Sequence, residues 1–168
     1  MRRVLAGAAG ALVAEALLAL IVVGLGGAPV NADRKPSALE TRLFGMALRS
    51  SVARNVAAEA DPPPPSHDDL TAGAEIYDEM CARCHGASAG GANALAGSFY
   101  PPAPILPGHR STYREVELFW IIKHGIRNTA MPAWGRLLSD DDVRQVAALV
   151  KRFDGPPAAA EADASAIR

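Results

Sequence analysis

The chain contains only two cysteines, which stand three positions apart in the run Cys81-Ala82-Arg83-Cys84 and are followed directly by His85. The stabilisation that a disulfide gives grows with the length of the loop it closes, so a bond between these two would staple almost nothing. Aromatic residues make up only 5% of the 168 residues, which leaves little material for an apolar core. We therefore expect the cysteine pair to hold a group that supplies part of the core.

Three chemistries use such a cysteine pair. A thioredoxin-like redox motif follows a strand of a parallel sheet, and no strand pattern is readable here. A structural zinc site needs a second cluster of thiols or imidazoles, whereas the other three histidines are scattered singly. Covalent haem attachment needs two thiols for the vinyl groups and a neighbouring imidazole on the same side of the ring. The motif therefore predicts one haem c bound to Cys81 and Cys84, with His85 as an axial iron ligand.

The N-terminal segment is apolar from Val4 to Ala28, after Arg2 and Arg3, and is interrupted only by Glu15. Such a run spans ~37 Å as a helix, enough for a ~30 Å hydrocarbon core. It fits an uncleaved membrane anchor, or a signal peptide cleaved after the small-residue site at 30–32. Length favours the anchor, and the carboxyl group within the run favours the signal peptide. Either interpretation exports the rest of the chain.

The segment at 33–65 combines a helix with a proline-rich linker. Ser37 and Glu40 form a capping box at the helix start. The helix carries apolar residues broadly on one face: Leu39, Leu43, Met46, Ala47 and Val56. This pattern predicts an amphipathic helix that lies on a membrane surface or partner subunit, or that packs on its own domain. Pro62 to Pro65 favour a stiff, extended linker.

Three further helices are expected between 66 and 155, with no strand, so the fold class is all-α. The first runs from Leu70 to Cys81, and a long Gly- and Pro-rich loop follows from Gly86 to His109. Thr112 with Glu115 predicts the start of the middle helix, which stops at Gly125. A last helix is capped by Ser139 and Asp142 and ends before Gly155. Residues 156–168 are expected to be disordered.

These patterns divide the chain into a transmembrane anchor or signal peptide at 1–32, the amphipathic helix and linker at 33–65, a haem domain at 66–155, and a tail at 156–168. The haem domain has a net charge of −2, and its basic residues form no stripe with interleaved aromatics. No nucleic acid partner is therefore expected, and no strong electrostatic steering of a redox partner.

From Leu70 to Phe153 the sequence resembles the class I c-type cytochromes, in particular the single-haem, membrane-anchored kind with a haem domain like that of the cbb3-type oxidase cytochrome c subunits. The resemblance rests on 73–86, on 125–134 and on the capped last helix. It implies a class I cytochrome c fold, in which the first and last helices cross around one haem. The contacts implied at the crossing join Gly73 and Tyr77 to Val146, Val150 and Phe153. The family also places the domain outside the cytoplasm, in the periplasm or its equivalent.

The second axial ligand is expected later in the chain. Met131 lies 46 residues after His85 in the run Thr-Ala-Met-Pro, which matches the family. His109 and His124 are rival ligands, and Met80 lies on the wrong side of the ring. By resemblance, a carbonyl of the proline loop would accept the other N–H of the axial imidazole. The candidates for that carbonyl are Pro102 and Pro104. The candidates for donors to the haem propionates are Trp134, Arg110 and Tyr113.

Two filled axial positions leave the iron no open site for substrate. We therefore expect an electron carrier rather than an enzyme, with redox proteins as partners, no small-molecule substrate, and a respiratory or dehydrogenase-linked chain as its setting. The alternatives are a cytochrome subunit of a dehydrogenase or oxidase complex, which would use the 37–56 helix as its interaction surface, and a five-coordinate haem that acts as a peroxidase or gas-binding site.

Overall fold

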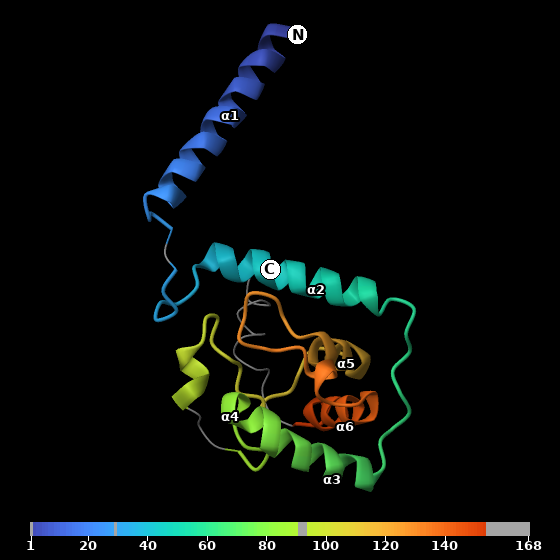
Figure 1. The fold of residues 1–168 in the computed structure, drawn as a ribbon. Coiled ribbons are helices and arrows are strands. Elements are labelled where there is room, and N and C mark those ends of the chain that lie inside the picture. Colours follow the sequence, from blue (N-terminus) through green and yellow to red (C-terminus); the bar gives the residue numbers. More distant parts are fainter. Residues whose placement is uncertain (1, 29, 91–93, 154–168) are drawn as a thin grey trace. The chain divides into compact units, whose positions relative to one another are not determined.

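The computed structural model describes residues 2–28, 30–90 and 94–153, and it divides into one unit that ends at Asn31 and another that begins at Ala32. In the first unit, α1 runs from Arg2 to Gly24 (Figure 1). Its stretch Gly7–Gly24 is apolar and long enough to cross a membrane, and no part of that stretch is buried. The predicted disordered tail at 156–168 lies outside the described residues.

The second unit contains only helical elements among its described residues, which confirms the all-α class (Figure 1). Its longer helices are α2 (Ala38–Asn55), α3 (His67–Ile76), α5 (Glu115–His124) and α6 (Asp140–Lys151). A π-helical turn (Tyr77–Cys81) and α4 (Ala82–His85) continue α3 directly. Short 3-10 turns occupy Ala94–Ser98 and Trp134–Arg136.

The crossing of α3 and α6 organises the core. A Cβ added to Gly73 would collide with the carbonyl oxygen of Gln145, so only glycine permits this close approach. One turn further on, the rings of Tyr77 and Phe153 pack edge to face, with centroids 5.3 Å apart. Tyr77, Val146 and Val150 belong to one buried cluster with the inner face of α5. The crossed first and last helices expected from the sequence are confirmed.

Helix α2 packs on this domain, most closely with its second half. Val52 and Val56 are fully buried, and the Arg49 guanidinium lies over the ring of Tyr113, 5.3 Å from its centroid. The expected grouping of Val56 with Leu39 on one face is wrong, because the residues at the start of the helix that share that pattern are exposed. The interpretation that the helix packs on its own domain therefore holds for one face only.

The start of α5 differs from the sequence prediction. The helix begins at Glu115, with Arg114 rather than Thr112 at the N-cap position. The Glu117 carboxylate accepts the Arg114 N–H at 2.7 Å, and the Asp61 carboxylate accepts the Val116 N–H at 3.2 Å. Part of the cap thus comes from the linker, 55 positions earlier, where local sequence cannot reveal it.

Candidate functional site

The cysteine pair lies where the π-helical turn passes into α4. An extra residue in a helical turn shifts the register of the side chains that follow, and such turns often occur at functional sites. Here the turn ends at Cys81, which is buried, while Cys84 lies half-buried in α4. Both thiols are free of disulfide bonds, and burial raises the pKa of the Cys81 thiol to about 12. The two sulfur atoms are therefore held on one short helical segment, and the Cys81 sulfur is in the thiol form.

The imidazole of His85 is fixed from one side. Its Nδ1 lies 2.8 Å from the carbonyl oxygen of Pro104, so this nitrogen carries the proton and donates it, and Nε2 stays available as a ligand. The backbone carbonyl of His85 also accepts the N–H of Leu106 at 3.1 Å. Burial lowers the pKa of the His85 ring, while the bond to Pro104 opposes the shift. A neutral, oriented imidazole is the form that binds a metal.

Of the two candidate prolines, Pro104 supplies this carbonyl. The loop that carries it is tied elsewhere as well. The Tyr100 hydroxyl donates to the Glu40 carboxylate of α2 at 2.8 Å. At the beginning of the loop, Asp78 accepts the backbone N–H and the hydroxyl of Ser88, at 2.7 and 2.5 Å. The long loop is therefore pinned at its start and beside its proline run.

Met131 lies in a tight turn directly after α5. The Thr129 hydroxyl donates to the carbonyl of Ile126 at 2.8 Å and accepts the N–H of Met131 at 3.1 Å. The N–H of Ile126 in turn donates to the Met131 carbonyl at 3.2 Å. Gly125 has a φ of +66°, and a Cβ there would lie 2.6 Å from the Pro132 carbonyl. Glycine thus allows the turn to fold back onto the end of α5.

The proximal motif and the methionine turn meet in one hydrophobic cluster. Cys81 belongs to its buried part, and Met131, Leu106 and Trp134 pack against it while remaining half-buried. The cluster supplies one thiol, the thioether of Met131 and an apolar lining, and Cys84 and His85 follow Cys81 on α4; together these are the groups that bind a haem c. Among the described residues no group of three or more His, Cys, Asp or Glu could hold a metal ion directly. The residues present therefore fit a haem.

The rival iron ligands and the candidate propionate donors lie at several different places in the domain. His124 is exposed at the end of α5, with its ring 4.9 Å from that of Trp120. His109 is half-buried in the loop, and Met80 is exposed. The propionate candidates Trp134 and Tyr113 pack against the cluster, whereas Arg110 is exposed. The role of Thr129 could not be predicted from the sequence, because a threonine two positions before a methionine is too common a pattern to indicate a hydrogen bond to it.

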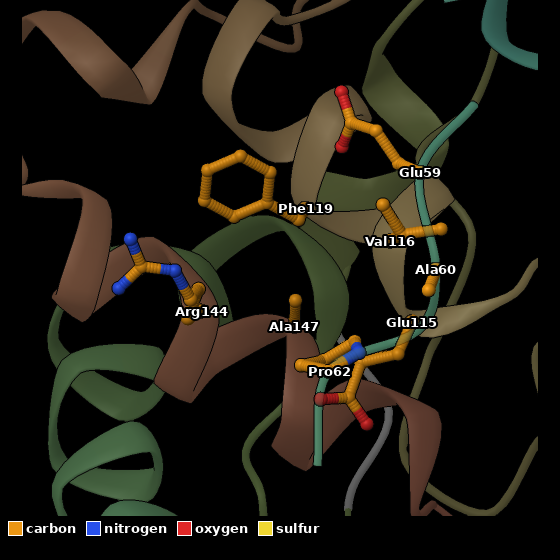
Figure 2. A pocket seen from close by; sticks show the side chains of 8 residues that line it. All are labelled: Glu59, Ala60, Pro62, Glu115, Val116, Phe119, Arg144 and Ala147. Atoms are coloured by element: carbon orange, nitrogen blue, oxygen red, sulfur yellow. The ribbon is translucent and has the colours of Figure 1, made fainter. Parts of the chain in front are cut away.

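A separate cavity of about 150 Å³ lies between the linker and helices α5 and α6 (Figure 2). It is far below the ~300 to 1,000 Å³ typical of small-molecule sites. Its walls include Pro62 from the linker, Phe119 from α5 and Arg144 from α6, and none of the motif residues. We regard it as a packing defect beside the linker.

Comparisons with known proteins identify the family of the chain. A family model described as cytochrome c oxidase, cbb3-type, subunit III matches residues 68–150. Cytochrome c6 from Picosynechococcus sp. is 35% identical over 86 residues, which cover 49% of this chain and 71% of that protein. A chain of the Kuenenia stuttgartiensis reducing HAO-like protein complex aligns with 56% of this chain and 47% of its own length, at 21% identity and a TM-score of 0.46. This last likeness is too weak to inform about function.

The match to cytochrome c6 covers most of that protein, and the range of the family model, 68–150, contains the cysteine pair and most of the crossing helices. Together with the family model and the all-helical fold, it shows that the chain belongs to the single-haem class I c-type cytochromes, which hold a covalent haem c and transfer electrons.

Proposed function

We propose that this protein carries electrons through one haem c, bound by thioether bonds to Cys81 and Cys84 and ligated by His85 and Met131, in a respiratory or dehydrogenase-linked chain outside the cytoplasm. The observation that carries the proposal is the shared cluster, which brings the buried Cys81 and the half-buried Met131 of a later turn together. The haem-binding part would be the domain at 66–155.

The chain's own residues would do three things for the cofactor. Pro104 holds the proton on Nδ1 of His85, so that the ligand nitrogen is Nε2. The turn at 126–131 presents a thioether, which raises the iron potential relative to a second imidazole. The apolar side chains around Cys81 keep water from that side of the site. The haem itself supplies reversible one-electron chemistry.

The ligand assignment is tested by paired methionine variants. Met131→Ala should lower the midpoint potential and let the reduced protein bind CO, because a thioether ligand is lost. Met80→Ala is the matched control, since that side chain is exposed and directly precedes the motif. An unchanged potential without CO binding in Met131→Ala would assign the ligand to another residue, and His109→Ala and His124→Ala would then identify it.

Covalent attachment is tested on the wild-type protein. Reduced-minus-oxidised spectra should show a sharp c-type alpha band, and the haem should stay with the polypeptide in acid acetone. A high-spin ferric spectrum of the protein as isolated would instead favour a five-coordinate haem and a peroxidase or gas-binding role.

We also propose that α1 remains as an anchor, with the cytochrome domain in the periplasm. Its length and apolar composition support this, and a soluble form would result if the chain were cleaved at residue 32. Membrane fractionation and the mass of the mature chain separate the two: an N-terminus at Asp33 would contradict the anchor.

The second candidate function is a cytochrome subunit of a dehydrogenase or oxidase complex. It is favoured by the match to a family model that describes an oxidase subunit. Gentle detergent solubilisation followed by purification distinguishes a subunit of such a complex from a free electron carrier. Stoichiometric co-purification with a catalytic subunit supports the complex, and a monodisperse single chain that reacts with soluble redox partners supports the free carrier.

A further inference from the structure

Helix α2 carries one row of side chains that is turned toward its own domain. The row recurs with helical spacing, and its last two members are fully buried while the first three are half-buried: Thr41, Gly45, Leu48, Val52 and Val56. This row accounts for the packing of α2 on the domain, where it contacts α5. Four large apolar residues in the first half of the helix do not belong to it and are exposed.

Three of them, Leu39, Leu43 and Met46, share one face, which we call the outer stripe; the fourth, Phe44, lies roughly 130° away from it. The side chains of the outer stripe are 66%, 52% and 60% exposed. Their spacing of four and three places them on a single face, and at 100° per residue this face is turned by roughly 150° from the packed row. The outer stripe therefore points away from the domain on which α2 packs.

The outer stripe is confined to the first half of α2. Beyond Met46 the same face continues with Ser50 and Ala53, which add little apolar surface. The fully buried Val52 and Val56 lie at the other end. The half of the helix that follows the N-terminal unit along the chain is thus the half that exposes apolar side chains.

The length of the connection limits how far this half can lie from an anchored α1. Thirteen residues separate Gly24, where α1 ends, from Ala38, where α2 begins. An extended connection of that length reaches at most ~45 Å, so an anchored α1 keeps the first turn of α2 within about one domain diameter of the membrane. This step rests on the proposal that α1 remains as an anchor.

The charges around the outer stripe suit a lipid surface. Asp33, Arg34 and Lys35 precede the helix, and Arg42 lies beside the stripe, so cations outnumber acids there. The nearest acidic group of the helix, Glu40, accepts hydrogen bonds from the Ser37 backbone and the Tyr100 hydroxyl, at 2.9 and 2.8 Å. Cations that flank an apolar face are typical of helices that lie in the plane of an anionic membrane.

We propose that α2 lies in the membrane interface, with the outer stripe inserted at the headgroup and acyl-chain boundary of an anionic bilayer. The opposite face of the same helix holds the cytochrome domain. The domain would then be attached to the membrane at two points, α1 and α2, which restricts its rotation relative to membrane-bound redox partners.

The test measures lipid exposure in the full-length, haem-loaded protein. Leu43→Cys and Met46→Cys are spin-labelled in nanodiscs of phosphatidylcholine and phosphatidylglycerol, where oxygen partitions into lipid and a polar nickel complex does not. The native cysteines are in thioether bonds and do not react. Ser51→Cys, exposed on another side of α2, and Thr71→Cys, exposed on α3, are the matched controls. Leu17→Cys in α1 marks the bilayer interior, and an unchanged alpha band shows that each variant is folded.

The proposal expects an oxygen-to-nickel collision ratio at Leu43→Cys and Met46→Cys that is roughly threefold or more above that at Thr71→Cys, because polar reagents are excluded from apolar surroundings. Ratios equal to the Thr71→Cys value, with Leu17→Cys in lipid, overturn the inference and leave the anchor standing. Labels shielded from both reagents also overturn it, since a protein partner or second copy then covers the stripe. A Leu17→Cys label in water, or a mature chain without α1, contradicts the anchor and the inference together.

Discussion

Cys81, Cys84 and His85 lie on an uninterrupted helical run from His67, whereas Met131 lies in a turn outside any helix. On the cysteine side the run crosses α6, and the imidazole is tied to a distant loop through Pro104. On the methionine side the support is local and consists of three hydrogen bonds among residues 126–131. A side chain on such a turn can leave its position without unfolding a helix, so the two sides should respond differently to substitution.

The largest expected effect is on the cysteine side. Replacing Cys81 and Cys84 by Ala should abolish covalent haem, and with it the alpha band and haem staining on a denaturing gel, because no thiol remains to form a thioether bond. Met131→Ala should keep full staining, since the proposed bond from this thioether to the iron is not needed for attachment. Equal loss of staining in both variants would contradict the proposed difference between the two sides.

Gly125→Ala should be the most destabilising single change to the backbone of the methionine turn. The φ of +66° and the collision of a Cβ with the Pro132 carbonyl together should destabilise the native turn by roughly 2 to 4 kcal/mol. We expect the methionine–iron charge-transfer band of the ferric protein to weaken while the haem stays attached.

Gly97→Ala is the control for that change, because a Cβ there meets nothing within 4 Å and the glycine lies outside the left-handed region. Thermal unfolding of the two variants should differ clearly. If Gly125→Ala retains the wild-type band and melting temperature, the turn is more adaptable than its contacts indicate.

A smaller effect is expected from Thr129→Val, which removes the hydroxyl that bridges Ile126 and Met131. Losing these bonds should weaken the turn by about 1 to 2 kcal/mol, which corresponds to about a 5- to 30-fold rise in the fraction of open turn. CO should bind the reduced protein faster by a similar factor. Tyr77→Phe is the control on the cysteine side: it removes a long 3.4 Å hydrogen bond to the His85 carbonyl and should leave the rate of CO binding unchanged. Equal CO-binding rates in the two variants would contradict the proposed difference between the two sides.

The smallest expected difference between the cysteine side and the methionine side is in how acid changes their contribution to stability. The pKa of Asp69 is lowered by hydrogen bonds from the Ser66 hydroxyl and backbone at the start of α3, and by Gln145. Since the folded-state pKa lies below the usual aspartate value of about 3.9, this stabilisation is present above that value and is lost as pH falls through the folded pKa. No carboxylate takes part in the three bonds of the methionine turn.

Urea unfolding curves at neutral and acidic pH check this difference. Asp69→Ala should be less stable than wild type at pH 7, and the two proteins should converge on acidification. Thr129→Val should keep a constant deficit across the same range. A stability gap between Asp69→Ala and wild type that persists in strong acid would show that the residue acts through something other than its charge.

Much of the fold was accessible from local spacing. Capping boxes at Ser37 and Ser139 place the starts of α2 and α6 correctly, because a cap depends on residues three positions apart. The crossing was expected at Gly73 from the family resemblance, and the structure shows the contact that excludes a side chain. The start of α5 was placed too early, because Asp61 of the linker caps that helix from outside the local sequence.

The sequence by itself determined the cofactor chemistry and the order of the helices, since the cysteine pair, the adjacent histidine and the caps all act over a few residues. Only the tertiary structure decided which proline carbonyl holds His85, how Met131 is supported, and that α2 has a packed row and an opposite outer stripe. These depend on where the chain returns to itself, at separations such as the 19 positions between His85 and Pro104 or the 60 between Glu40 and Tyr100. Local patterns carry no record of such contacts, because many chain paths satisfy the same helical spacing.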